Sequence, residues 1–108
     1  MIGEILAQLA IDLNGTTEAP HFDRRAFKTQ TIFVTLAPDG RTANLKLDRD
    51  QQDHWCPLLP HGLAPVNNKW GNQGWTVMQL DKLTVDDIAM LVRLAWSNTA
   101  KARLSRKT

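Results

Sequence analysis

Residues 21–48 read HFDRRAFKTQTIFVTLAPDGRTANLKLD, and this stretch determines the fold. The aliphatic residues 32, 34 and 36 alternate with Thr31, Phe33 and Thr35, and the apolar residues 43, 45 and 47 alternate with the polar residues 44, 46 and 48. An alternation with a period of two is typical of β-strands that bury one face. The sequence Pro-Asp-Gly at residues 38–40 separates the two runs and favours a turn. The stretch therefore predicts a β-hairpin in which Val34 faces the core and Phe33 faces away from it.

The same region carries an excess of positive charge. Residues 24–49 contain six lysines and arginines and two aspartates, a formal charge of 6 − 2 = +4, against +2 for the whole chain. Strand parity places Arg24, Lys28 and Lys46 together on the face opposite the core. A cationic sheet face of this kind favours a polyanionic partner, with binding that depends strongly on salt.

Three helices are predicted around these strands. Apolar residues repeat at helical spacing from residue 2 to residue 13 and end at Asn-Gly, a favourable helix stop. Asp48 can cap a helix over residues 49–56, which prolines then end. Thr84 can cap a C-terminal helix, and the four cations of residues 101–107 suit the negative end of its dipole.

Further strands are predicted over residues 24–29, 63–67 and 75–80. Residues 16–23 are expected to form a connector, in which Pro20 disfavours a helix at Ala19 and sets up the approach to the sheet. A glycine-rich link at residues 70–74 joins the last two strands as a hairpin tip or a wide bulge. The resulting order is α-β-β-β-α-β-β-α. We expect an α+β fold, a two-layer α/β domain whose helices cover one face of a mostly antiparallel five-stranded sheet.

Length and composition suit one intracellular domain. A chain of 108 residues supports a single core, so residues 1–108 are expected to form one domain. Cys56 is the only cysteine, which excludes an internal disulfide and suits a reducing compartment. The first fifteen residues contain Glu4 and Asp12, the wrong charges for a secretory signal, and no apolar run is long enough to cross a bilayer. We expect a cytoplasmic protein without a membrane partner.

Several motifs together resemble one protein family. They are APHFDRRAFK, TIFVTLAPDGRTANLKLD and the W-G-x-x-G-W link of residues 70–75, followed by a terminal helix. With these motifs the chain resembles the MmcQ/YjbR-like family over essentially its whole length. The resemblance implies a small α/β domain of the kind seen in type III secretion chaperones. It also implies DNA binding through two β-hairpin wings, which on this chain would be residues 38–41 and 70–74.

The resemblance also suggests which side chains would contact DNA. The candidate phosphate contacts are Arg24, Arg25, Lys28, Arg41, Lys46 and Lys69. Contacts of this kind position a nucleic acid without reading its sequence.

Two features leave alternatives open. Trp70 and Trp75 could stack on a base, worth about 1–3 kcal/mol each, or pack onto the sheet while the neighbouring glycines permit the turn. Lys46 could belong to a recognition face, or could keep a solvated sheet face soluble and protect it from edge pairing.

Catalytic and metal sites are not predicted. His54, Cys56 and His61 lie close in sequence, but prolines interrupt the segment and no fourth ligand stands at a recognised spacing. Gly71 and Gly74 lack the Lys-Ser/Thr that would follow in a phosphate-binding loop. We therefore expect a DNA-binding module with no catalytic activity, metal or cofactor. The alternative is a protein- or peptide-binding, chaperone-like domain that uses the open sheet face.

Overall fold

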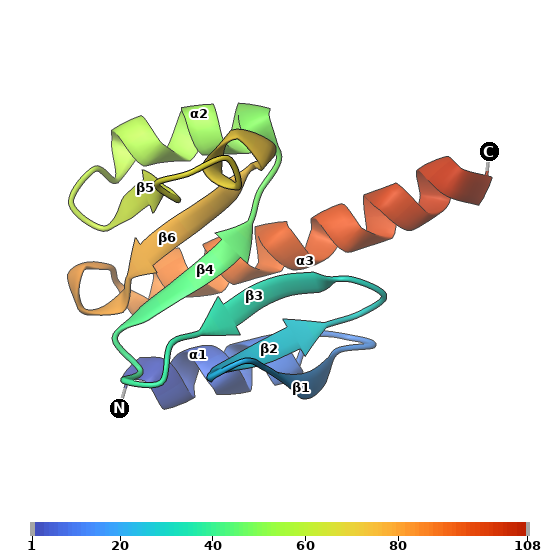
Figure 1. Cartoon of the computed structure of the whole chain (residues 1–108), viewed down its shortest axis with the longest axis horizontal. Helices are drawn as coiled ribbons and strands as arrows, with labels where there is room; N and C mark the ends of the chain where they lie inside the picture. Colours follow the sequence, from blue (N-terminus) through green and yellow to red (C-terminus); the bar gives the residue numbers. More distant parts are fainter. Residues whose placement is uncertain (1, 108) are drawn as a thin grey trace.

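One antiparallel sheet organises the chain (Figure 1). The structure is a computed structural model that describes the backbone of residues 2–107 and the side chains of residues 2–99. The elements, in order, are α1 (Ile2–Ile11), β1 (Thr17–His21), β2 (Arg24–Lys28), β3 (Ile32–Leu36), β4 (Thr42–Lys46), α2 (Arg49–Leu58), β5 (Leu63–Pro65), the 3-10 helix η1 (Gly71–Gln73), β6 (Trp75–Gln79), the 3-10 helix η2 (Leu80–Lys82) and α3 (Val85–Lys107). The strand order across the sheet is β1-β2-β3-β4-β6-β5.

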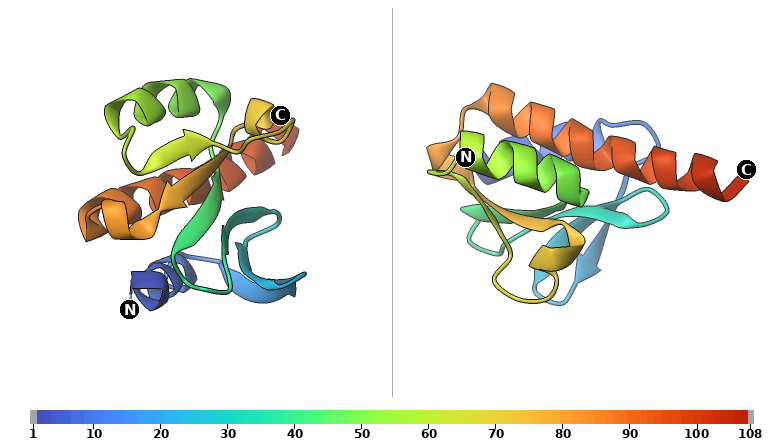
Figure 2. Two further views of the ribbon diagram at one scale, coloured as in Figure 1. Left: turned by 60° about the vertical axis from the view of Figure 1, so that its left-hand side comes forward. Right: turned by 90° about the horizontal axis from the view of Figure 1, so that it is seen from above.

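The helices cover one face of the sheet. α1 packs on β2 and β3, α3 packs on β3 and β4 and against α1, and α2 lies on β5. Figure 2 shows the helices on one side of the sheet, with the opposite face uncovered. The largest fully buried side chains between the layers include Leu6, Phe27, Leu45 and Leu91. The predicted α+β, two-layer class is confirmed.

The sheet has six strands where five were predicted. The additional strand, β1, lies inside the stretch that was expected to be a connector. It pairs with β2 from Thr17↔Lys28 to His21↔Arg24, and most of its residues are exposed. An exposed edge strand has no alternation of apolar residues to reveal it, and a proline is compatible with such a strand because the edge needs no amide hydrogen there. Each edge strand contains a proline, Pro20 in β1 and Pro65 in β5.

A register shift between β2 and β3 changes which side chains are buried. Phe27 pairs with Val34 and Lys28 pairs with Ile32, so Phe33 is the additional residue of a β-bulge. Phe33 is fully buried in the core, and Ile32, opposite Lys28, faces the open side. The prediction that Phe33 faces away from the core was therefore wrong, because a bulge reverses strand parity where it occurs.

The helix caps follow the predicted chemistry. The Gln51 amide donates to Asp48 Oδ1 at 2.7 Å, and the Asp87 amide donates to Thr84 Oγ1 at 3.0 Å. α2 continues to Leu58 with Pro57 in its last turn, two residues beyond its predicted end. α3 extends to Lys107. The expected role of the cations of residues 101–107 concerns side chains outside the described part.

Arg25 fastens α1 to the sheet. Its Nη1 donates to Glu4 Oε1 on α1 at 2.9 Å, and its Nε donates to Glu18 Oε2 on β1 at 2.7 Å. The guanidinium also lies over the Phe27 ring, 5.8 Å from the ring centroid. Neighbouring residues of a strand face opposite sides, so Arg25 points toward the helices and Arg24 away from them. Arg25 therefore does not join the other predicted phosphate contacts.

We expect Gly74→Ala to destabilise the protein by several kcal/mol. Gly74 has φ +104°, and a Cβ there would overlap the Leu47 carbonyl oxygen. Gly15 also has a positive φ, +76°, but a Cβ at that position would meet no atom within 4 Å, so Gly15→Ala is the matched control. It should cost about 1 kcal/mol. Urea unfolding of both variants measures the difference, and equal losses would contradict the role of the close approach.

The Glu18–Arg25 ion pair should make the free energy of unfolding depend on pH in the acidic range. The hydrogen bonds from Arg25 lower the pKa of the Glu18 carboxyl. A lowered folded-state pKa contributes stability above the unfolded pKa of about 4.3, and this contribution is lost as the pH falls through the folded value. The pair is partly exposed, so we expect Glu18→Gln to cost up to about 1 kcal/mol at pH 7 and less at pH 3.

Urea unfolding at both pH values measures this change. A double-mutant cycle with Arg25→Gln isolates the pair from the other contacts of each residue. A coupling energy that stays the same at pH 7 and pH 3 would contradict the assignment.

Candidate nucleic-acid interface

The charged strand residues on the open face of the sheet are all positive. Strand register places Arg24, Lys28 and Lys46 on this face, opposite His21, Thr17 and Trp75 respectively. Glu18 is the only carboxylate within the six strands, and it lies on the helix side with Arg25. The sheet therefore separates its charges between its two faces.

A hollow of about 330 Å³ lies in this open face. Its lining combines mostly aromatic and polar side chains from five strands and two loops: His21, Phe22, Arg24, Thr35, Asn44, Val66, Asn68, Trp70 and Trp75. Phe22 comes from the β1–β2 turn, and Trp70 comes from the β5–β6 connection. Both loops extend from the sheet on the side away from α3 (Figure 2, right). The hollow is therefore bounded by two projecting loops, each carrying an aromatic ring.

Phe22 is held in solvent by its turn. It is 93% exposed, and its φ of 60° is rare for an aromatic residue. The His21 ring packs edge-on against it, with ring centroids 4.9 Å apart. Phe22 was not among the predicted site residues, although it stands two residues before the basic pair Arg24-Arg25. A strained, exposed aromatic residue at the rim of a hollow is typical of a functional position.

The floor of the hollow is polar. Arg24 Nε donates to Thr35 Oγ1 at 2.9 Å, and its Nη2 donates to the Thr35 carbonyl oxygen at 3.3 Å. Burial lowers the pKa of the Arg24 guanidinium, and the charges of Asp23 and Asp39 act in the opposite direction. An arginine remains protonated under either influence. Asn44, which pairs with Thr35 in the β3–β4 register, adds an amide to this floor.

Hydrogen bonds from Gln52 and Lys46 hold the 70–74 link that carries Trp70. Buried Gln52 of α2 donates from Nε2 to the carbonyl oxygens of Gly71 and Trp75, at 2.9 and 3.2 Å. Lys46 Nζ donates to the Gln73 carbonyl oxygen at 2.7 Å. Lys46 thus has a structural bond that the strand pattern did not predict.

The two tryptophans differ in exposure. Trp70 is 49% exposed, and Trp75 is half-buried in β6 opposite Lys46. Both line the hollow. The side chains are therefore placed where a bound ring could reach them.

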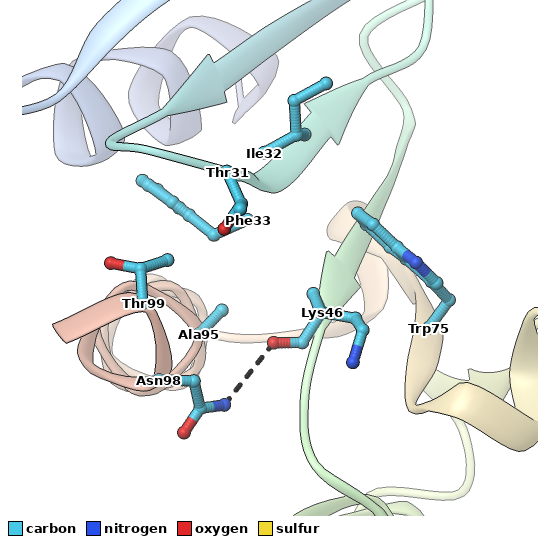
Figure 3. Close-up of a pocket in the computed structure, with 8 residues that line it drawn as sticks. All are labelled: Thr31, Ile32, Phe33, Lys46, Trp75, Ala95, Asn98 and Thr99. Atoms are coloured by element: carbon cyan, nitrogen blue, oxygen red, sulfur yellow. Dashed lines mark hydrogen bonds between the residues drawn. The ribbon is translucent and has the colours of Figure 1, made fainter. Parts of the chain in front are cut away.

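A second hollow, of about 530 Å³, adjoins the first (Figure 3). It lies beyond the Val34↔Leu45 pair, where β3 and β4 separate, and α3 contributes Ala95 and Thr99 to it. In Figure 3, Phe33 points toward α3 and Ile32 points away from it. Trp75 lines both hollows, so the two are neighbours at this side chain.

The remaining candidates lie in loops. Arg41 is exposed in the β3–β4 turn, and Lys69 Nζ lies 5.9 Å from the centroid of the Trp70 ring. The two loops predicted as wings stand at opposite ends of β4, because residues 38–41 precede Thr42 and residues 70–74 lie beside Lys46. The 38–41 turn leans on α1, where a Cβ on Gly3 would come within 2.8 Å of the Gly40 oxygen. The turn that faces the 70–74 link across the hollow is instead the β1–β2 turn.

Two observations on the described part of the chain concern metal and thiol chemistry. No group of three or more His, Cys, Asp or Glu side chains there could hold a metal ion. Burial raises the pKa of the half-buried Cys56 thiol, and the charge of Asp53 raises it further. The thiol is therefore a weaker nucleophile than a free cysteine at neutral pH. None of the described helices has the length and apolar character required to cross a membrane.

Comparison with known proteins identifies the family. A search of curated proteins gave no match. A crystal structure of the Deinococcus radiodurans protein DR2400, whose domain is described as DUF419, has the same fold, with a TM-score of 0.71. The two sequences are 19% identical, and the match covers 84% of this chain and 72% of that one. The family model described as YjbR matches residues 11–98, and the chain therefore belongs to the YjbR family.

Proposed function

We propose that this protein binds nucleic acid, with DNA as the expected partner, through the open face of its sheet and without catalysing a reaction. The observation that carries the proposal is the separation of charge. Arg24, Lys28 and Lys46 lie on the open face, and the only strand carboxylate lies on the other side. A surface of this kind attracts phosphates from solution and releases their counterions on binding.

The proposed phosphate contacts differ in whether their charged groups already bind other groups of the protein. Lys28 and Lys69 take part in no ion pair within the described residues, so both ammonium groups can meet a phosphate. Arg24 and Lys46 already donate to oxygens of the protein, to Thr35 and Gln73. Arg24 and Lys46 therefore combine a structural bond with remaining hydrogen-bond donors, and Lys28 and Lys69 are the better test of charge.

Phosphate contacts of this kind bind weakly and with little sequence preference. They position a nucleic acid and carry no direct information about its bases. Nonspecific binding of this class has dissociation constants of about 10⁻⁴ to 10⁻⁶ M at physiological salt. The two loops that would embrace the ligand are the β1–β2 turn and the 70–74 link.

A second candidate function is peptide binding on the same face. The observation that favours it is the exposure of apolar rings, 93% for Phe22 and 49% for Trp70. An apolar or aromatic peptide segment could bury both rings. This interaction would depend little on charge, so reversal of Lys28 and Lys69 should leave it nearly intact.

We expect the double variant Lys28→Glu/Lys69→Glu to weaken binding of a 20-nucleotide DNA. The measurement is fluorescence anisotropy from 20 to 200 mM NaCl, with single-stranded and duplex probes. Each lost phosphate contact should reduce the slope of log Kd against log salt by about one. The wild-type protein should bind at least one of the two probes at 20 mM NaCl.

Arg93→Glu is the matched control. Arg93 is exposed on α3, on the helix side of the sheet, where it lines a shallow hollow with Leu9 and Asp12 of the α1 region. This variant changes the net charge as each single lysine reversal does and should leave binding almost unchanged. Absence of binding by the wild-type protein at 20 mM NaCl, or equal weakening by Arg93→Glu and Lys28→Glu, would refute the proposal.

A further inference from the structure

We infer that the open face selects single-stranded nucleic acid and receives an unpaired base between Phe22 and Trp70. The inference rests on the proposed function and adds the class of nucleic acid. It follows from the shape and chemistry of the hollow more than from net charge.

The walls of the hollow suit a flat aromatic ring. Phe22 and Trp70 line it from opposite loops, and Trp75 adds a third ring at its base. Phe22 is almost fully exposed and adopts a backbone conformation that is costly for an aromatic residue. Aromatic side chains that project into a cationic groove are the usual platform on which single-stranded nucleic acids stack their bases.

The floor of the hollow suits the polar edge of a base. Arg24 is held in place by its two bonds to Thr35, and the Asn44 amide lies in register beside Thr35. An amide offers both donors and an acceptor to a base edge, and a guanidinium offers donors only. An aliphatic peptide side chain would leave these groups without partners, which costs binding energy.

Charge and access together favour an unpaired strand. Lys28 and Lys46 lie on the same face of the sheet as the hollow. Their positive charges there suit the phosphates on either side of an inserted base. Lys69 lies against the Trp70 ring and adds a further positive charge at the rim. The bases of a duplex are stacked and paired, so a duplex could offer phosphates to these cations but no ring to the hollow.

The experiment compares four probes on the whole protein by fluorescence anisotropy at 50 mM NaCl. They are a 15-nucleotide oligothymidine, the matching oligouridine, an abasic deoxyribose-phosphate strand of equal length and a DNA duplex. Oligothymidine should bind about 5- to 150-fold more tightly than the abasic strand, the range that stacking of one base supplies. The oligouridine arm distinguishes DNA from RNA as the source of the base.

Three variants assign the effect to the aromatic walls. Phe22→Ala and Trp70→Ala should each weaken oligothymidine binding by about 5-fold or more and leave the abasic strand unaffected. Phe22→Trp should restore binding, because it returns a ring to the same position. Leu58→Ala is the control, since Leu58 is a large apolar residue, 58% exposed, on α2 away from the hollow. Thermal unfolding confirms that each variant is folded.

The outcomes separate this inference from the function on which it rests. Equal affinity for oligothymidine and the abasic strand would overturn the inference and leave phosphate binding intact. Tighter binding of the duplex than of either single strand would also overturn it. Binding of none of the four probes would overturn both, and binding of an aromatic peptide in their place would support the alternative function.

Discussion

The open face depends on the hydrogen bonds that the buried side-chain amide of Gln52 donates. This amide joins α2 to η1 and to the start of β6, through the carbonyl oxygens of Gly71 and Trp75 and through Thr76 Oγ1 at 3.2 Å. A buried amide must satisfy its donors, so the loop cannot move away without leaving Gln52 unpaired. The two glycines of the link are required for a steric reason, because a Cβ at Gly71 or Gly74 would strike the backbone of Val66 or Leu47. The W-G-x-x-G-W motif is thus a packing arrangement that also presents Trp70.

The sheet combines a packed face with a charged one through strand parity. Arg24 and Arg25 are neighbours in sequence, yet one lies in the hollow and the other binds Glu4 on α1. The bulge at Phe33 alters this alternation at one point only, and it buries a further aromatic ring against α3. Because of strand parity, the carboxylate of Glu18 lies on the helix side with Arg25, and the charged strand residues of the opposite face are cations.

Local pattern was sufficient to predict most of the fold. The caps at Asp48 and Thr84, the alternation in β4 and the helical stripes all lie within short stretches of sequence, where their physical causes act. The burial of Phe33 was not predictable in this way, because a bulge depends on the partner strand. β1 escaped prediction because an exposed edge strand needs no apolar residues.

The candidate site was only partly predictable for a related reason. The cations Arg24, Lys28 and Lys46 follow from strand parity, but the meeting of Phe22 and Trp70 across the hollow depends on the order of strands in the sheet. No local signal encodes that order. The prolines at the two borders of the sheet, Pro20 and Pro65, have a different consequence. A proline lacks the amide hydrogen that strand pairing uses, so neither edge strand can pair along its whole length with a strand of a second molecule. The protein should therefore resist intermolecular β-aggregation at high concentration.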